Sequence, residues 1–196
     1  VTHLCHFDIP LLSNIPNLVY LAPTTKEEYL AMLDWSLEYK EHPVAIREPF
    51  GITTPAKRPV VTDYSELNRY ELVKKGRDVA IIAAGNFFAL GEATCDMLKA
   101  KNMEATLINP RFISGIDTEL MEKLKADHRI VVTLEDGALS GGFGEKIARY
   151  FGNSEMKVLC YGARKEFVDR YNLADFLASN RLREDLITED ILSLCK

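Results

Sequence analysis

The first eight residues bring together four side chains that can do chemistry: His3, Cys5, His6 and Asp8. Imidazole and thiolate groups bind zinc, and a histidine can deprotonate a cysteine to make a nucleophile. The spacing is too crowded for one extended segment to close a tetrahedral site, and the sequence shows no second ligand pair. We therefore expect no metal ligand here and retain His3 as a residue that hydrogen-bonds or transfers a proton.

A second candidate is Arg47, at the end of the apolar stretch 44–47. Ligands of α/β sheets bind at the carboxyl ends of the strands, and a guanidinium group suits bidentate binding of a phosphate. A structural ion pair with a nearby acid is the alternative. From the residue types alone the two interpretations are equally supported.

A glycine-rich stretch, residues 137–144, follows a predicted strand and opens a predicted helix. The amides of a helix N-terminus can hold an anion there. The stretch matches neither common phosphate-binding pattern, and Glu135, Asp136 and Glu145 beside it would repel a phosphate. We favour a tight turn that lets helix and strand approach closely, with anion binding as the alternative.

The elements that must position these residues start with a β-α-β unit. Residues 18–22 and 44–47 read as its strands, and Thr25 with Glu28 forms a capping box that opens the helix between them. The buried stripe of that helix is predicted to contain Tyr29, Leu30, Met32, Leu33 and Leu37.

Apolar strands alternate with helices in the second half of the chain, which predicts a mostly parallel sheet covered on both faces. The fold class is therefore α/β. We place a partial unit at 1–51, a linker at 52–69 and a second domain at 70–196. In that domain the expected strands are 70–75 (at the edge), 78–86, 105–110, 129–135 and 157–162, and the expected helices include one capped by Asp117 and others at 145–151, 166–171 and 187–195.

The composition excludes several classes of protein. A net charge of −5 without a basic cluster argues against nucleic acid as a partner. No apolar run reaches the ~20 residues of a membrane span. The four cysteines, three of them in apolar surroundings, indicate reduced thiols and a cytoplasmic location.

Several motifs occur in an order that resembles the transketolase-type thiamine diphosphate enzymes, and the 1-deoxy-D-xylulose-5-phosphate synthases most closely. The early motifs are T-H-x-x-x-F-D and A-I-R-x-P, and the later ones are VAIIAAGNFFALGEA, INPRFISGID and VVTLEDGALSGGFG. The resemblance covers essentially the whole chain. It assigns residues 1–51 to the end of the pyrimidine-binding domain and 70–196 to a transketolase C-terminal-type domain.

This resemblance implies roles for two residues. His3 would contact the hydroxyl and carbonyl groups of the substrate and assist proton transfer as the catalytic residue, and Arg47 would bind the phosphate of glyceraldehyde 3-phosphate. The family's reaction joins pyruvate, after decarboxylation, to that aldehyde, with thiamine diphosphate and magnesium as cofactors. Members of the family form homodimers.

Two departures from the family pattern affect these roles. Leu4, Cys5 and His6 follow Thr2-His3 where the family has Gln, Gly and a small or apolar residue, and Phe50 replaces an arginine in A-x-R-x-P-R-G.

The chain also lacks the family's diphosphate- and magnesium-binding segments and its activating glutamate. We therefore expect a C-terminal fragment that binds no cofactor, is inactive alone and self-associates. The alternatives are the corresponding part of a transketolase or a non-catalytic regulatory or interaction module on the same scaffold.

Overall fold

The computed structural model describes residues 6–48, 54–169 and 172–195. Its first part contains a short helix and a β-α-β unit: α1 (Asp8–Leu12), β1 (Val19–Leu21), α2 (Lys26–Glu38) and β2 (Val44–Ile46). The second part begins with β3 (Glu71–Lys74), β4 (Asp78–Ala83), the 3₁₀ turn η1 (Gly85–Phe87), α3 (Phe88–Lys99) and β5 (Thr106–Asn109). It continues with α4 (Thr118–Leu124), β6 (His128–Ala138), α5 (Phe143–Phe151), β7 (Lys157–Ala163), α6 (Leu173–Ser179) and α7 (Glu184–Leu194).

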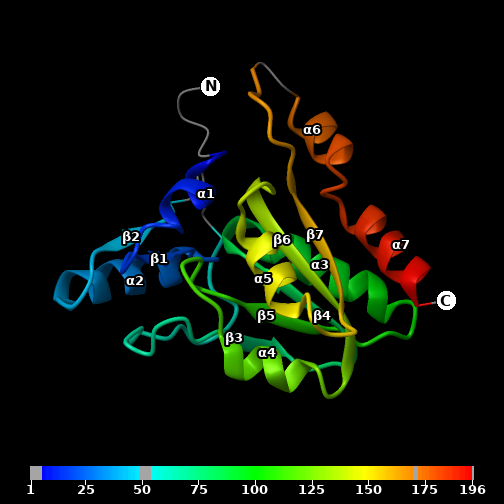
Figure 1. The fold of residues 1–196 in the computed structure, drawn as a ribbon, viewed down its shortest axis with the longest axis horizontal. Helices are drawn as coiled ribbons and strands as arrows, with labels where there is room; N and C mark the ends of the chain where they lie inside the picture. The colour runs from blue at the N-terminus through cyan, green and yellow to red at the C-terminus, as the bar shows by residue number, and fades with distance from the viewer. Residues whose placement is uncertain (1–5, 49–53, 170–171, 196) are drawn as a thin grey trace.

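A five-stranded sheet with the order β3-β5-β4-β6-β7 forms the centre of the molecule (Figure 1). Its strands run parallel except for β3, which pairs antiparallel with β5 at the edge. This confirms the predicted α/β class, the mostly parallel sheet and the edge strand near residue 70.

Both faces of this sheet are covered, because neighbouring residues of β4 point to opposite sides. Ile81 packs in a cluster with α3 and α7, whereas Ile82 packs in a second cluster with α4 and α5. Both isoleucines are fully buried. Apolar residues at every position of β4 after Asp78 are the pattern expected of a parallel strand covered on both faces.

A second, two-stranded parallel sheet pairs β1 with β2 and lies at the blue end of the ribbon in Figure 1. The loop after β5 joins it to the larger sheet: Phe112 bridges to Leu21, and the amide of Ile113 donates to the carbonyl of Tyr20 at 2.7 Å. The predicted boundaries at 51 and 69 stay predictions. Residues 54–70 form no helix or strand, yet Tyr64 among them is buried in the core.

The predicted buried stripe of α2 is largely wrong. Met32 is fully buried, but Leu30, Leu33 and Leu37 are 46, 36 and 62% exposed. The buried face runs instead through Glu28, Met32 and the half-buried Trp35, because a helix can place only one face against the β1–β2 sheet. The exposed Leu30, Leu33 and Leu37 have helical spacing of their own, and for this reason the sequence pattern predicted the wrong face.

The structure also tests the helix predicted near the carboxyl end of the chain. Residues 166–169 are not helical, so a helix over 166–171 is wrong for these four positions. The helix α6 begins later, where the side chain of Asn172 accepts a hydrogen bond from the amide of Asp175.

Among the described residues, no helix combines the length and the apolar character needed to cross a membrane.

Candidate acceptor-binding site

Arg47 lies directly after β2, and its backbone amide donates to the carbonyl of Leu21 at 2.8 Å. Its guanidinium group holds two carboxylates. Nε and Nη2 donate to the two oxygens of Asp8 at 2.5 and 3.1 Å, and Nη1 donates to Asp136. All three side chains are mostly buried, with 12 to 18% of each exposed. The structure therefore shows the ion pair that the sequence left as an alternative, and phosphate binding at Arg47 stays a proposal.

Asp8 is fixed from a second side by Tyr20 of β1. The Tyr20 hydroxyl donates to Asp8 Oδ2 at 2.5 Å. Burial, reinforced by the Asp8 carboxylate, raises the pKa of the Tyr20 phenol, so this hydroxyl keeps its proton and acts as a donor. The first turn of α1 and the strands β1 and β2 thus hold one carboxylate against one guanidinium.

Asp136 comes from the other sheet, near the carboxyl end of β6. The side-chain amide of Asn86, in the turn after β4, donates to Asp136 Oδ2 at 3.1 Å. The carboxyl ends of parallel strands are the usual ligand-binding edge of an α/β sheet. Arg47 therefore lies where the ligand edge of the large sheet meets the end of the small one.

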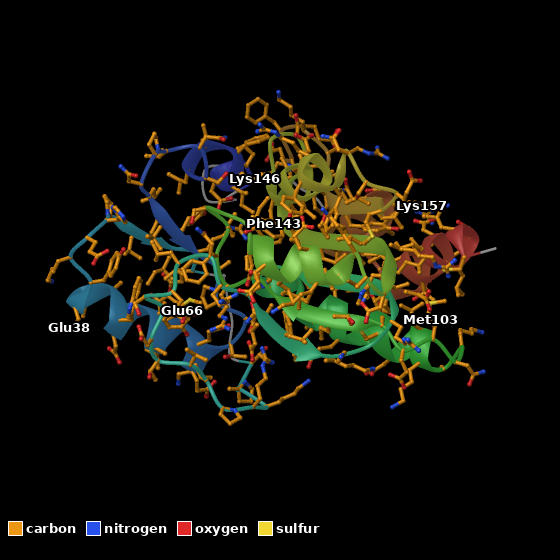
Figure 2. All side chains as sticks on the ribbon, turned by 60° about the horizontal axis from the view of Figure 1, so that its bottom comes forward. Glu38, Glu66, Met103, Phe143, Lys146 and Lys157 are labelled. Carbon is orange, nitrogen blue, oxygen red and sulfur yellow. The ribbon has the colours of Figure 1, made fainter. Side chains whose placement is uncertain are left out.

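The glycine-rich stretch already contains an anion supplied by the chain itself. The two carboxylate oxygens of Glu135 accept hydrogen bonds of 2.8 Å from the amides of Phe143 and Gly144 at the N-terminus of α5. Figure 2 labels Phe143 in the crowded centre of the molecule. Burial raises the pKa of the Glu135 carboxyl to about 7, against the opposing effect of these two donors and Arg47.

The favoured interpretation of this stretch, a tight approach of helix to strand, is confirmed. A Cβ atom on Gly144 would lie 2.5 Å from Thr133 Oγ1 and 3.0 Å from Cys160 Cβ. A Cβ atom on Gly142 would lie 2.5 Å from a Glu135 oxygen. Glycine is needed at both positions because any larger residue would push α5 away from the sheet.

His3 and Cys5 lie outside the described residues, so the structure does not test the role predicted for His3. His6 is described: its Nε2 lies 3.0 Å from the carbonyl oxygen of Arg164, and its ring packs edge-on against Phe7 at 4.9 Å. Asp8 accepts hydrogen bonds from Arg47. In the described part of the chain, no three His, Cys, Asp or Glu side chains are grouped so that they could hold a metal ion.

A polar cluster that the sequence analysis missed lies at the junction of the two sheets. The buried Glu28 accepts from the Thr24 amide and hydroxyl, each at 2.7 Å, and from the Asn109 side chain at 2.9 Å. Its own amide donates to Thr25 Oγ1 at 3.2 Å, as the capping box predicts. The side chain of Glu28 does not return to the amide of Thr25, as a capping box would have it. It accepts from Thr24 and from Asn109, the last residue of β5. No periodic pattern marks such a contact.

Comparison with known proteins assigns the class of this fold. The family model described as "Transketolase, C-terminal domain" matches residues 68–179, more than half of the chain. The chain therefore belongs to the transketolase C-terminal domain family.

Curated relatives match nearly the whole chain. The 1-deoxy-D-xylulose-5-phosphate synthase of Clostridium tetani is 31% identical over 98% of this chain and 31% of its own length. The synthase of Heliobacterium modesticaldum is 37% identical over 74% of this chain and 22% of its own length. The chain thus spans less than a third of the length of these two relatives, and it resembles their C-terminal part.

Solved structures show the same fold. A structure described as "Split gene transketolase, inactive beta4 tetramer" superposes with a TM-score of 0.79 at 22% identity. The superposition covers 96% of this chain and 60% of the transketolase chain. A transketolase mutant from Pichia stipitis superposes with a TM-score of 0.69 at 13% identity, over 92% of this chain and 25% of its own. At these identities the likeness concerns the fold alone.

The described residues do not fit thiamine diphosphate with magnesium. The amides of a helix N-terminus can bind a diphosphate, but at α5 the carboxyl group of Glu135 accepts the hydrogen bonds of the Phe143 and Gly144 amides. Magnesium is usually held through carboxylates, and no three His, Cys, Asp or Glu side chains of the described residues are grouped so that they could hold a metal ion.

Proposed function

We propose that this chain forms the acceptor-binding part of a thiamine diphosphate-dependent transferase that resembles 1-deoxy-D-xylulose-5-phosphate synthase. The observation that carries the proposal is the position of Arg47, a buried guanidinium at the meeting edge of the two sheets. Its motif, A-I-R-x-P, is the one that resembles the family's phosphate-binding arginine. The substrates would be pyruvate and glyceraldehyde 3-phosphate, and the products a 1-deoxyxylulose phosphate, a precursor of isoprenoids and thiamine, and carbon dioxide.

Arg47 suits an anionic acceptor because it stays charged and is held in one orientation. Burial acts to lower the pKa of its guanidinium, but the carboxylates of Asp136 and Asp8 outweigh burial and raise that pKa. The bidentate contact with Asp8 fixes the plane of the group. In this proposal His3, five residues before Asp8, contacts the reacting hydroxyl and carbonyl groups and assists proton transfer.

Titration of glyceraldehyde 3-phosphate into the chain, followed by NMR, tests this role. We expect Arg47→Gln to weaken binding of glyceraldehyde 3-phosphate and to leave the weaker binding of uncharged glyceraldehyde unchanged. Arg129→Gln is the matched control, since it removes an arginine that is 66% exposed and lies at the opposite end of β6. Equal binding by the wild type and Arg47→Gln would refute the assignment.

We further propose that the chain alone binds no thiamine diphosphate and has no transferase activity. Calorimetric titration with thiamine diphosphate and magnesium should show no saturable binding. A micromolar dissociation constant would show that these residues hold the cofactor themselves.

Self-association and a cytoplasmic location complete the proposal. Leu30, Leu33 and Leu37 expose an apolar stripe on α2, and Figure 2 places Glu38 at the end of the same helix, far from the large sheet. An exposed apolar stripe favours contact with another protein surface. Light scattering should therefore report a dimer or a larger species, and a clean monomer would contradict this part of the proposal.

A non-catalytic interaction module on the same scaffold is the second candidate. The ion pairs of Arg47 favour it, because a guanidinium that already holds Asp8 and Asp136 is a sufficient structural link between two sheets. Under this alternative Arg47→Gln lowers the stability of the chain but changes no binding of phosphorylated aldehydes.

A further inference from the structure

We propose that Asp136 is an exchangeable partner of Arg47, so that this carboxylate of the large sheet competes with the acceptor's phosphate and sets the charge preference of the site. The inference rests on the proposed function, because it concerns the same guanidinium. It assigns a specificity-determining role to a residue on the C-terminal-type domain.

The two carboxylates on Arg47 are not equivalent. Asp8 accepts two hydrogen bonds from the guanidinium and a third from the hydroxyl of Tyr20, so displacing its carboxylate would break three hydrogen bonds, against two for Asp136. Asp136 contacts the guanidinium through Nη1 and is tied on its other oxygen to the neutral amide of Asn86. Asp136 also has the more exposed side chain, at 18% against 13% for Asp8. Exchange at Nη1 therefore costs fewer contacts than exchange at Nε and Nη2.

A phosphate oxygen makes the same kind of charge-assisted hydrogen bond to a guanidinium as a carboxylate oxygen does. An acceptor phosphate that binds Arg47 through Nη1 thus needs the position that Asp136 Oδ1 occupies. If Asp136 stayed in place, the phosphate would lie beside a carboxylate of like charge, which opposes binding.

The surrounding charges strengthen this competition. Asp8 and Asp136 place two carboxylates on the one guanidinium of Arg47, and Asp136 is also among the groups that raise the pKa of Glu135. Like charge at a binding site is a common means of discriminating between ligands of different charge. An uncharged aldehyde meets no such repulsion, so Asp136 shifts the preference of the site toward less charged acceptors.

Asp136→Asn tests this inference, because it removes the charge and keeps the size of the side chain. Asp136→Ala is the second variant, since it removes the charge without leaving an amide opposite Asn86. Glu155→Gln, an exposed residue, is the control for a change of one unit in net charge. Each protein is titrated with inorganic phosphate, glyceraldehyde 3-phosphate and glyceraldehyde at low ionic strength, and NMR spectra and urea unfolding verify that it is folded.

We expect both Asp136 variants to bind phosphate and glyceraldehyde 3-phosphate about tenfold more tightly, or better, than the wild type, because they lack the repulsion between like charges. Glyceraldehyde affinity should not change, Glu155→Gln should match the wild type, and adding Arg47→Gln should abolish the gain. If the Asp136 variants bind no more tightly while Arg47→Gln still weakens binding, Asp136 is not a competitor and the proposed function survives. If no protein binds phosphate through Arg47, the proposed function fails together with this inference.

Discussion

The buried carboxyl group of Glu135 predicts an unusual dependence of stability on pH. The native protein holds the Glu135 proton more tightly than the unfolded chain, because burial raises the native pKa from an ordinary 4.5 to about 7. Raising the pH through this range therefore removes a proton more readily from the unfolded chain and lowers the free energy of unfolding. The Glu135→Gln variant has no proton to lose at this position and should lack this decrease.

The size of the effect follows from the two pKa values. Between pH 4.5 and 7 the wild type should lose up to about 1.4 kcal/mol per pH unit through this group, or on the order of 3 kcal/mol in all. Groups that do not interact with Glu135 titrate equally in both proteins. The difference in unfolding free energy between the variant and the wild type should therefore isolate the contribution of Glu135.

Urea unfolding from about pH 5 to about pH 8 measures this difference. We expect Glu135→Gln to gain about 2–3 kcal/mol relative to the wild type across that range. Glu155→Gln, which alters an exposed carboxylate, should run parallel to the wild type. An NMR titration of the Glu135 carboxyl carbon gives its native pKa without any variant. Parallel curves for the wild type and Glu135→Gln, with a native pKa near 4.5, would refute the reasoning.

Three further predictions concern packing and reactivity. Gly144→Ala should cost about 1–3 kcal/mol in urea unfolding, since its Cβ atom would lie 2.5 Å from Thr133 Oγ1; an unchanged midpoint would mean that α5 can move. Met32→Ala should cost about 2–4 kcal/mol and Leu37→Ala less than about 0.5, because Met32 is fully buried and Leu37 is 62% exposed; equal losses would contradict this description of α2. Burial raises the pKa of the Cys95 thiol to about 11, so mass spectrometry should find Cys95 unmodified by a thiol reagent at neutral pH until the protein unfolds. Rapid modification of Cys95 in the folded protein would contradict its buried position.

Much of the fold could be predicted because the central strands β4 and β6 contain runs of mostly apolar residues. The stretch 78–86 predicts a strand buried on both faces, and residues 78–83 form β4 in the middle of the sheet; the predicted end is too late, because a 3₁₀ turn begins at Gly85. The sequence also predicts Asp117 as the N-terminal cap of α4. In the structure the Asp117 carboxylate accepts from the amide of Leu120, three residues along the chain, at 3.0 Å. Such features depend on neighbours in sequence, and sequence patterns report them directly.

The candidate site was predicted only in part, because its contacts join distant residues. The motif around Arg47 identified the guanidinium, yet Asp8 and Asp136 reach it from 39 and 89 residues away. From the sequence, the acids of the glycine-rich stretch are expected to repel a phosphate. In the structure Glu135 takes the place of such an anion at the α5 N-terminus. The spacing of residues along the chain does not predict which distant side chains will be in contact.

The most direct test of the account observes the guanidinium of Arg47 itself. NMR spectra of ¹⁵N-arginine-labelled protein, assigned with Arg47→Gln, would follow the Nε–H signal that the short bond to Asp8 should protect from exchange. Titration with glyceraldehyde 3-phosphate should shift this signal saturably, and glyceraldehyde at the same concentrations should not. An Arg47 signal that stays unchanged while glyceraldehyde 3-phosphate shifts other residues would show that the acceptor phosphate binds elsewhere.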